Sequence, residues 1–139
     1  MSSSTMEARL TSGAVSIAVE VHGYAYDSAA TGPDANWLKA SFKLETPEIR
    51  VQKALVVQAA TVASWATEVL RSSTEGDIAN LEEDFRLHLQ GDCASLMVQL
   101  DRGGTGEVNL TFPTTQDTVL SFGQALEEMA WAYPPRDAQ

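Results

Sequence analysis

Alternation between hydrophobic and polar residues predicts three β-strands in the first half of the chain. Apolar side chains recur at every second position over residues 15–22, 38–45 and 49–57, and many of them are β-branched. The third segment loses this alternation towards its end, as strands that are buried on both faces do. Residues 23–36 follow neither the strand period nor the helix period. Their Gly, Pro, Asp and Asn residues predict a long loop.

The same alternation returns in the second half and predicts three more strands, over residues 85–90, 96–100 and 108–112. Gly91-Asp92 is typical of the turn of a β-hairpin. The glycine run Gly103-Gly104-Thr105-Gly106 is interpreted as a second turn, because glycine readily adopts the positive φ that such turns require. These segments predict an antiparallel arrangement.

Two segments have the helical period. Thr61 is the expected N-cap of the first helix and Gly76 its expected end, and Asp117 is the expected N-cap of the second. The second helix is expected to end at Pro134-Pro135. The apolar stripes consist of Val62, Trp65, Val69 and Leu70 in the first helix, and of Val119, Phe122, Leu126, Met129, Ala130 and Tyr133 in the second.

The order of these elements predicts an α+β fold with antiparallel β-sheet structure of about six strands and two covering helices. The chain then consists of two similar halves, each with three strands followed by a helix. A length of 139 residues is enough for one core and too short for two independent ones. We expect a single globular domain over residues 14–136, preceded by a mobile N-terminal tail over residues 1–13.

Charge narrows the range of partners. Nineteen acidic residues against nine basic ones give a formal net charge of −10 at pH 7. A field of this sign repels phosphate backbones and anionic lipid head groups, which argues against nucleic-acid and membrane binding. One compensating use of so much negative charge is the fast capture of a cationic partner.

The single cysteine and the lack of a signal-like segment predict a cytoplasmic protein. Cys93 has no second cysteine with which to form an internal disulfide, whereas small secreted domains commonly contain several. The apolar run at residues 14–21 is interrupted by Glu20, and no segment reaches the length of a transmembrane helix.

Several combinations of residues were weighed as catalytic or metal sites, and none predicts one. Cys93 with His88 lacks a positively charged neighbour that would activate the thiol. His22 and His88 fall on the expected outward faces of different strands, without the close spacing of metal ligands. The carboxylate pairs, Asp92 with Asp101 and those within residues 82–84, lack an apolar setting that would raise a pKa. We expect no catalytic residue, no metal and no cofactor.

The acidic residues and the aromatic residues remain as candidates for partner binding. Tyr24, Tyr26 and Trp37 lie in or beside the predicted long loop, where they are expected to serve as interface anchors. Trp65 and Trp131 are expected in the core because of their helical positions. The acidic candidates are the consecutive Glu82, Glu83 and Asp84, with Glu68, Glu75, Asp77, Glu127 and Glu128 on or beside the helices.

The chain resembles the WapI-type immunity proteins of bacteria over roughly residues 14–136. The resemblance rests on Asp34-Ala35-Asn36-Trp37-Leu38 at the entry to a strand, on the layout of strands and helices, and on Ala132-Tyr133-Pro134-Pro135-Arg136 near the end. It implies a cytoplasmic antidote that binds and neutralises the toxic C-terminal domain of a polymorphic toxin, often a nuclease. It implies no catalytic residues.

The leading hypothesis is therefore a non-enzymatic immunity protein whose acidic face covers a cationic site on a toxin domain. Tyr24, Tyr26, Trp37, Glu82, Glu83 and Asp84 are its predicted partner-binding residues. The alternatives are an acidic regulatory protein or mimic of nucleic acid, and a small enzyme that uses Cys93 or paired carboxylates. The oligomeric state stays open.

Overall fold

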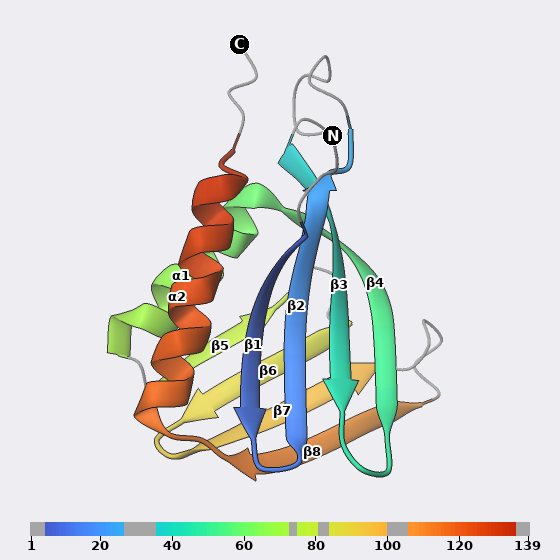
Figure 1. The fold of residues 1–139 in the computed structure, drawn as a ribbon, viewed down its shortest axis with the longest axis vertical. Helices are drawn as coiled ribbons and strands as arrows, with labels where there is room; N and C mark the ends of the chain where they lie inside the picture. The colour runs from blue at the N-terminus through green and yellow to red at the C-terminus, as the bar shows by residue number, and fades with distance from the viewer. Residues whose placement is uncertain (1–4, 27–35, 73–74, 81–83, 100–105, 136–139) are drawn as a thin grey trace.

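The computed structural model describes residues 5–26, 36–72, 75–80, 84–99 and 106–135 of the chain. The described chain has two halves with the same order of elements, four antiparallel strands followed by one helix (Figure 1). The first half consists of β1 (Met6–Ser12), β2 (Val15–Tyr24), β3 (Trp37–Glu45), β4 (Arg50–Gln58) and α1 (Ala59–Ser72). The second consists of β5 (Glu75–Ala79), β6 (Phe85–Gln90), β7 (Cys93–Gln99), β8 (Glu107–Pro113) and α2 (Gln116–Ala132).

The strands form two sheets in which neighbours in sequence are neighbours in space. Sheet A has the order β1-β2-β3-β4 and sheet B the order β5-β6-β7-β8. Figure 1 shows sheet B behind sheet A, with its strands crossing those of sheet A. Side chains alternate between the two faces of a strand. Each sheet therefore directs one apolar row from each strand towards the other sheet.

The core lies between the sheets and under the helices. Phe42 of β3 stacks on Phe85 of β6, with ring centroids 4.4 Å apart and ring planes 13° apart. Trp65 of α1 meets the edge of Phe85 at 5.7 Å, and its indole Nε1 donates a hydrogen bond of 3.1 Å to the carbonyl oxygen of Ala79. These contacts join both sheets and the first helix in one core, and the indole nitrogen keeps a partner despite its burial.

The two helices pack against each other along one side of the sheets, next to β1 and β5 (Figure 1). They approach each other closely at Gly123 of α2. A Cβ added there would lie 2.8 Å from Leu70 Cδ2 and 2.9 Å from Val69 Cγ1 of α1. Only a residue without a side chain lets the helices come so close.

The structure confirms the α+β class, the two similar halves and the two helices, but about six strands was too few. There are four strands in each described sheet. β1 lies within residues 1–13, which were expected to form a tail, and β5 contains Gly76, which was expected to end the first helix. Both are first strands of a half. Each lies at the sheet edge that a helix covers, so neither needs a long apolar run.

The expected helix starts were wrong by a few residues. α1 begins at Ala59, directly after β4, so Thr61 lies inside the helix. α2 is capped by Thr115 rather than Asp117. The Thr115 hydroxyl accepts a hydrogen bond from the backbone N–H of Thr118, and the Thr118 hydroxyl accepts one from the backbone N–H of Thr115. This reciprocal pair is a capping box with a hydroxyl in place of the usual Glu or Gln.

Candidate partner-binding surfaces

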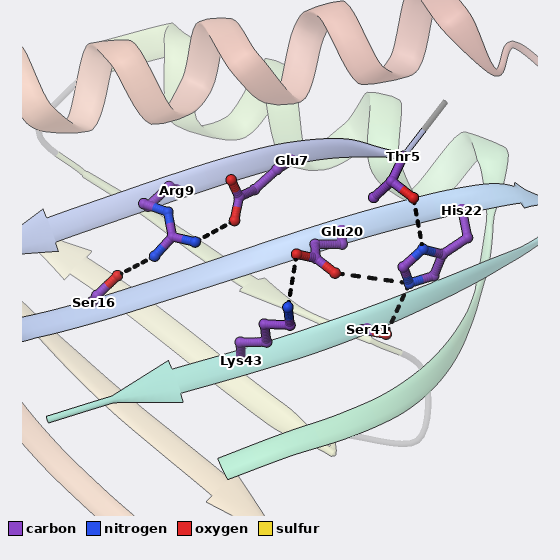
Figure 2. A network of polar contacts seen from close by, with 8 residues as sticks. All are labelled: Thr5, Glu7, Arg9, Ser16, Glu20, His22, Ser41 and Lys43. Atoms are coloured by element: carbon purple, nitrogen blue, oxygen red, sulfur yellow. Dashed lines mark hydrogen bonds and ion pairs between the residues drawn. The ribbon is translucent and has the colours of Figure 1, made fainter. Parts of the chain in front are cut away.

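The outer face of sheet A, the face turned away from sheet B, carries a network of polar contacts between β1, β2 and β3 (Figure 2). His22 is at its centre, with Nδ1 3.2 Å from the Thr5 hydroxyl and Nε2 2.9 Å from the Ser41 hydroxyl. Glu20 lies two residues before His22 on the same face and pairs with Lys43 Nζ at 3.0 Å. His22 does lie on an outward face, as predicted. Its ring, however, is held by two neighbouring segments rather than simply facing water.

Two further cations of this face, Arg9 and Arg50, are paired in the same way. Arg9 is in contact with Glu7 and donates to the Ser16 hydroxyl at 2.5 Å, while Arg50 pairs with Glu45 at 2.9 Å. Arg9, Lys43 and Arg50 line a shallow hollow of about 220 Å³. Each of these cations has an acidic partner on its own strand or a neighbouring one, so the hollow carries little net charge.

Asp84, one of the predicted partner-binding acids, is committed to contacts within the protein. Its Oδ1 accepts a hydrogen bond from Lys53 Nζ at 3.3 Å, and its Oδ2 accepts one from Asn80 Nδ2 at 2.9 Å. Lys53 belongs to β4 and also donates to the carbonyl oxygen of Gln99 on β7. The side chains of Lys53 and Asp84 are 16% and 17% exposed. This pair therefore links the two sheets, and Glu82 and Glu83 lie outside the described residues.

The three aromatic residues predicted as anchors lie near one another at the end of sheet A where β2 ends and β3 begins (Figure 1). Tyr26 is 52% exposed. Trp37 is half-buried, and so is Tyr24. The Tyr24 hydroxyl donates to the Pro134 carbonyl oxygen at 2.6 Å, and its ring meets that of Tyr133 edge-on at 5.5 Å. Tyr24 thus holds the chain that follows α2, which is a positioning role.

The outward face of α2 differs from the rest of the described surface. Asp117, Glu127 and Glu128 are all exposed on it, and the helix contains no Lys, Arg or His. Asp117 lies in the first turn, where a negative charge favours the helix dipole. Glu127 and Glu128 lie near the opposite end, where the dipole offers them no such stabilisation.

Trp131 of α2 is exposed, and the prediction that it is buried was wrong. It was expected in the core, yet it is 81% exposed, whereas Trp65 is buried as expected. The helical stripe could have shown this, because Trp131 lies four residues after Glu127 and falls outside the buried set. The buried residues of α2 are Val119, Phe122, Gly123, Leu126 and Met129.

A groove of about 520 Å³ runs between the two helices beside Trp131. We call it the α1–α2 groove. Small side chains of α1 form its floor, and Arg71 and Glu127 are its charged members. Its lining consists of Ala63, Ala66, Thr67, Leu70, Arg71, Glu127, Ala130 and Trp131. Arg71 is paired with Glu68 at 3.2 Å.

The outer face of sheet B carries the residues weighed as a thiol site. His88 Nδ1 lies 3.8 Å from Asp77 Oδ2, and no hydrogen bond joins the ring to Cys93 in the described part of the chain. Arg86 donates two hydrogen bonds to Asp77, at 3.1 and 2.7 Å. These bonds hold the pKa of the Asp77 carboxyl below its usual value. The described residues include no group of three His, Cys, Asp or Glu side chains that could hold a metal ion.

An exposed aromatic side chain on a solvated helix, beside a groove, has the features of a surface that binds another protein. A comparison with family models identifies the family of the chain. The model of the immunity protein WapI-like family matches residues 9–134, so the chain belongs to that family, as the resemblance predicted. No curated protein and no solved structure matches the chain. Among the described residues, no helix is long and apolar enough to cross a membrane.

Proposed function

We propose that this protein is an immunity protein that binds the toxic domain of a polymorphic toxin and neutralises it by occupying its active surface, without chemistry of its own. The observation that carries the proposal is the match of the immunity protein WapI-like family over residues 9–134. The match spans both helices and, apart from the first residues of β1, both sheets, so it includes the α1–α2 groove and most of the other surfaces described above.

The net charge supports a cationic toxin domain as the partner. A chain with a formal charge of −10 attracts a basic protein over distances near the Debye length, about 8 Å at physiological salt. Nucleases that bind a phosphate backbone need a cationic surface. A basic nuclease is therefore the toxin that this charge fits best, and the complex is expected to form more slowly as salt is added.

The partner-binding residues proposed from the sequence need one revision. Tyr26 and Trp37 remain candidates because both have solvent-exposed surface, and Glu82 and Glu83 remain candidates from the sequence. Asp84 and Tyr24 are better explained by their contacts within the protein. A test of the acidic contact must leave Asp84 intact, because changing it would disturb the link between the sheets.

Co-expression with the toxin domain encoded beside this gene tests the proposal. We expect host cells that make the toxin domain to survive only when they also make this protein. We also expect the two chains to co-purify. A toxin that kills in the presence of this protein, with no complex formed, would overturn the proposal.

The acidic contact is tested separately by the double variant Glu82→Lys, Glu83→Lys. It is expected to slow association about 10-fold at low salt, since electrostatic steering acts mainly on the association rate. The control is Glu48→Lys, which adds a positive charge at an exposed turn between β3 and β4. Equal rates for the double variant and the unchanged protein would remove these two residues from the proposed contact.

A further inference from the structure

The α1–α2 groove has a volume large enough to accept a side chain of another protein. Its volume of about 520 Å³ compares with about 220 Å³ for the hollow on sheet A. The depth comes from small side chains on α1, namely Ala63, Ala66 and Thr67. The helices touch at Gly123, and the groove lies further along α2, towards its C-terminal end.

Trp131 lines this groove, and 81% of its surface is exposed. A side chain so exposed contributes little to the stability of the fold. Trp side chains bury 150–250 Å² when they are covered, and burial of that size dominates the energetics of interfaces. The position is also fixed. The chain immediately after α2 is held by Tyr24, through the hydrogen bond to the Pro134 carbonyl and the ring contact with Tyr133. A backbone that is already held in place loses little freedom when the side chain that it carries binds a partner.

The charged residues around the groove indicate that the partner surface is positively charged. Glu127 lies one helical turn before Trp131, on the same side of α2, and Glu128 is its neighbour. The cation at the opposite rim, Arg71, is already paired with Glu68. With no base in α2, the rim carries an excess of negative charge. A basic surface complements it, and a phosphate backbone does not.

A second copy of the chain fits this rim poorly. A symmetric dimer through the outward face of α2 would bring the same acidic patch of both copies into one interface. Because α2 has no basic residue, Glu127 and Glu128 would add negative charge to both sides of that interface, which opposes association. The remaining candidate within the chain is the C-terminal segment 136–139, which contains Arg136.

We infer that the α1–α2 groove is where the toxin domain docks: a cationic segment of the toxin inserts an apolar side chain beside Trp131 and places a Lys or Arg against Glu127. This inference rests on the proposed function and names the contact through which it acts. Binding closes the groove and covers the indole ring. The carboxylates at the rim steer the basic segment to it.

Calorimetric titration of purified, catalytically inactivated toxin domain into the full chain tests the inference. Trp131→Ala is expected to weaken the Kd by at least about 30-fold, as for a tryptophan hot spot. Glu127→Lys is expected to weaken it about 10-fold, with a smaller effect as salt rises. The matched controls are Val56→Ala, at an exposed apolar residue of β4, and Glu48→Lys, the same charge change at a distant turn. Both controls are expected to change the Kd less than about 3-fold, within the range of near-neutral interface or surface positions.

The outcomes separate the two levels of the proposal. If the unchanged protein does not bind the toxin domain, the proposed function fails. If it binds, and Trp131→Ala binds equally well, the docking site is elsewhere and the inference about the groove fails. Because Trp131 is so exposed, the thermal midpoint of Trp131→Ala is expected to match that of the unchanged protein. A weaker Kd then reports a lost contact rather than a lost fold.

Two further measurements test the other occupants. A chain that ends at Pro135 is expected to bind the toxin with unchanged Kd, and a marked gain in affinity would identify segment 136–139 as the native occupant and overturn the inference. Sedimentation of the unchanged protein is expected to give no dimer that Trp131→Ala dissociates. Such a dimer would assign the groove to a second copy instead.

Discussion

The outer face of sheet A and the outward face of α2 differ in whether their charged side chains form ion pairs within the protein. On sheet A, each of Arg9, Lys43 and Arg50 is paired with an acidic residue of its own or a neighbouring strand. On α2, Glu127 and Glu128 are exposed on a helix without any basic residue. Charges that find partners within the chain contribute to the fold. Charges left without such partners, beside an exposed tryptophan, are better suited to binding another protein.

This contrast also separates composition from function. A net charge of −10 describes the whole chain, yet the sheet A face is close to electrically balanced. The same residue type has different roles at different places. Glu20 stabilises a strand pair, Asp84 links two sheets, and Glu127 meets solvent at the rim of a groove. The comparison can be tested by changing charges of each kind.

The largest effect is expected from Lys53, whose charge is paired between the sheets. Lys53→Met leaves Asp84 half-buried without its cation, and the Gln99 carbonyl without a donor, which we expect to lower the free energy of unfolding by about 3 kcal/mol. Urea unfolding followed by the fluorescence of Trp65 measures it. Lys39→Met is the matched control on the exposed side of sheet A, with an expected change within about 0.5 kcal/mol. Equal losses in both variants would contradict the role given to the inter-sheet pair.

Gly123 tests how α2 is seated. The methyl group of Gly123→Ala would press on Val69 and Leu70 and destabilise the protein by about 1–3 kcal/mol, against a gain in helix propensity of about 1 kcal/mol. We expect a net loss of up to about 2 kcal/mol. Thermal unfolding of this variant beside Ser121→Ala, at an exposed position of the same helix, checks the result. A stabilised Gly123→Ala would show that the helices are not held as close as described.

The paired and unpaired faces are compared directly by Glu20→Gln and Glu128→Gln. Glu20 is half-buried beside Lys43, so its variant is expected to lose about 0.5–1 kcal/mol of stability while the toxin Kd stays unchanged. The Glu128 variant is expected to keep its stability within about 0.5 kcal/mol and to associate with the toxin a few-fold more slowly. Chemical unfolding and stopped-flow association measure both. The reverse pattern would exchange the roles of the two faces.

The smallest effect concerns Asp77, whose pKa is lowered in the folded protein, mainly by the hydrogen bonds from Arg86. A lowered folded pKa means that the ionised carboxyl stabilises the fold above the unfolded pKa, near 3.8, and that this stability is lost as the pH falls through the folded pKa. Because the pair is partly exposed, we expect less than about 0.5 kcal/mol. Asp77→Asn should differ from the unchanged protein at pH 6 and match it near pH 2. A difference that grows with acidity would reverse the sign.

Most strands were predictable because one face of each is buried and the other is solvated. The rows of β6 and β8 alternate in sequence as they do in the structure, and those of β2 and β3 do so except at Ala18 and Ser41, which are buried as well. β1 and β5 were missed because they bring few apolar residues of their own. In β1 these are chiefly Ala8 and Leu10, and in β5 the inward positions are Gly76 and Ile78. Their burial comes from the helices packed beside them, which a local pattern does not contain.

The family was predictable from the sequence, but the arrangement of its surface was not. The partner of Asp84 is Lys53, 31 residues away, and no local pattern connects them. Trp131 was assigned to the core because it lies on a helix, although its place on that helix relative to Leu126 and Met129 points outward. Tyr24 was selected as a contact, and its hydroxyl is used to hold Pro134. Such assignments depend on contacts between distant segments.

The stacking of Phe42 on Phe85 joins two side chains that are widely separated in the sequence, so Phe42 is synthesised well before Phe85. When synthesis has reached the end of α1, sheet B does not yet cover the inward face of sheet A. The nascent chain therefore exposes an apolar surface of the kind that chaperones bind. That surface is covered only after the strands of sheet B have been synthesised.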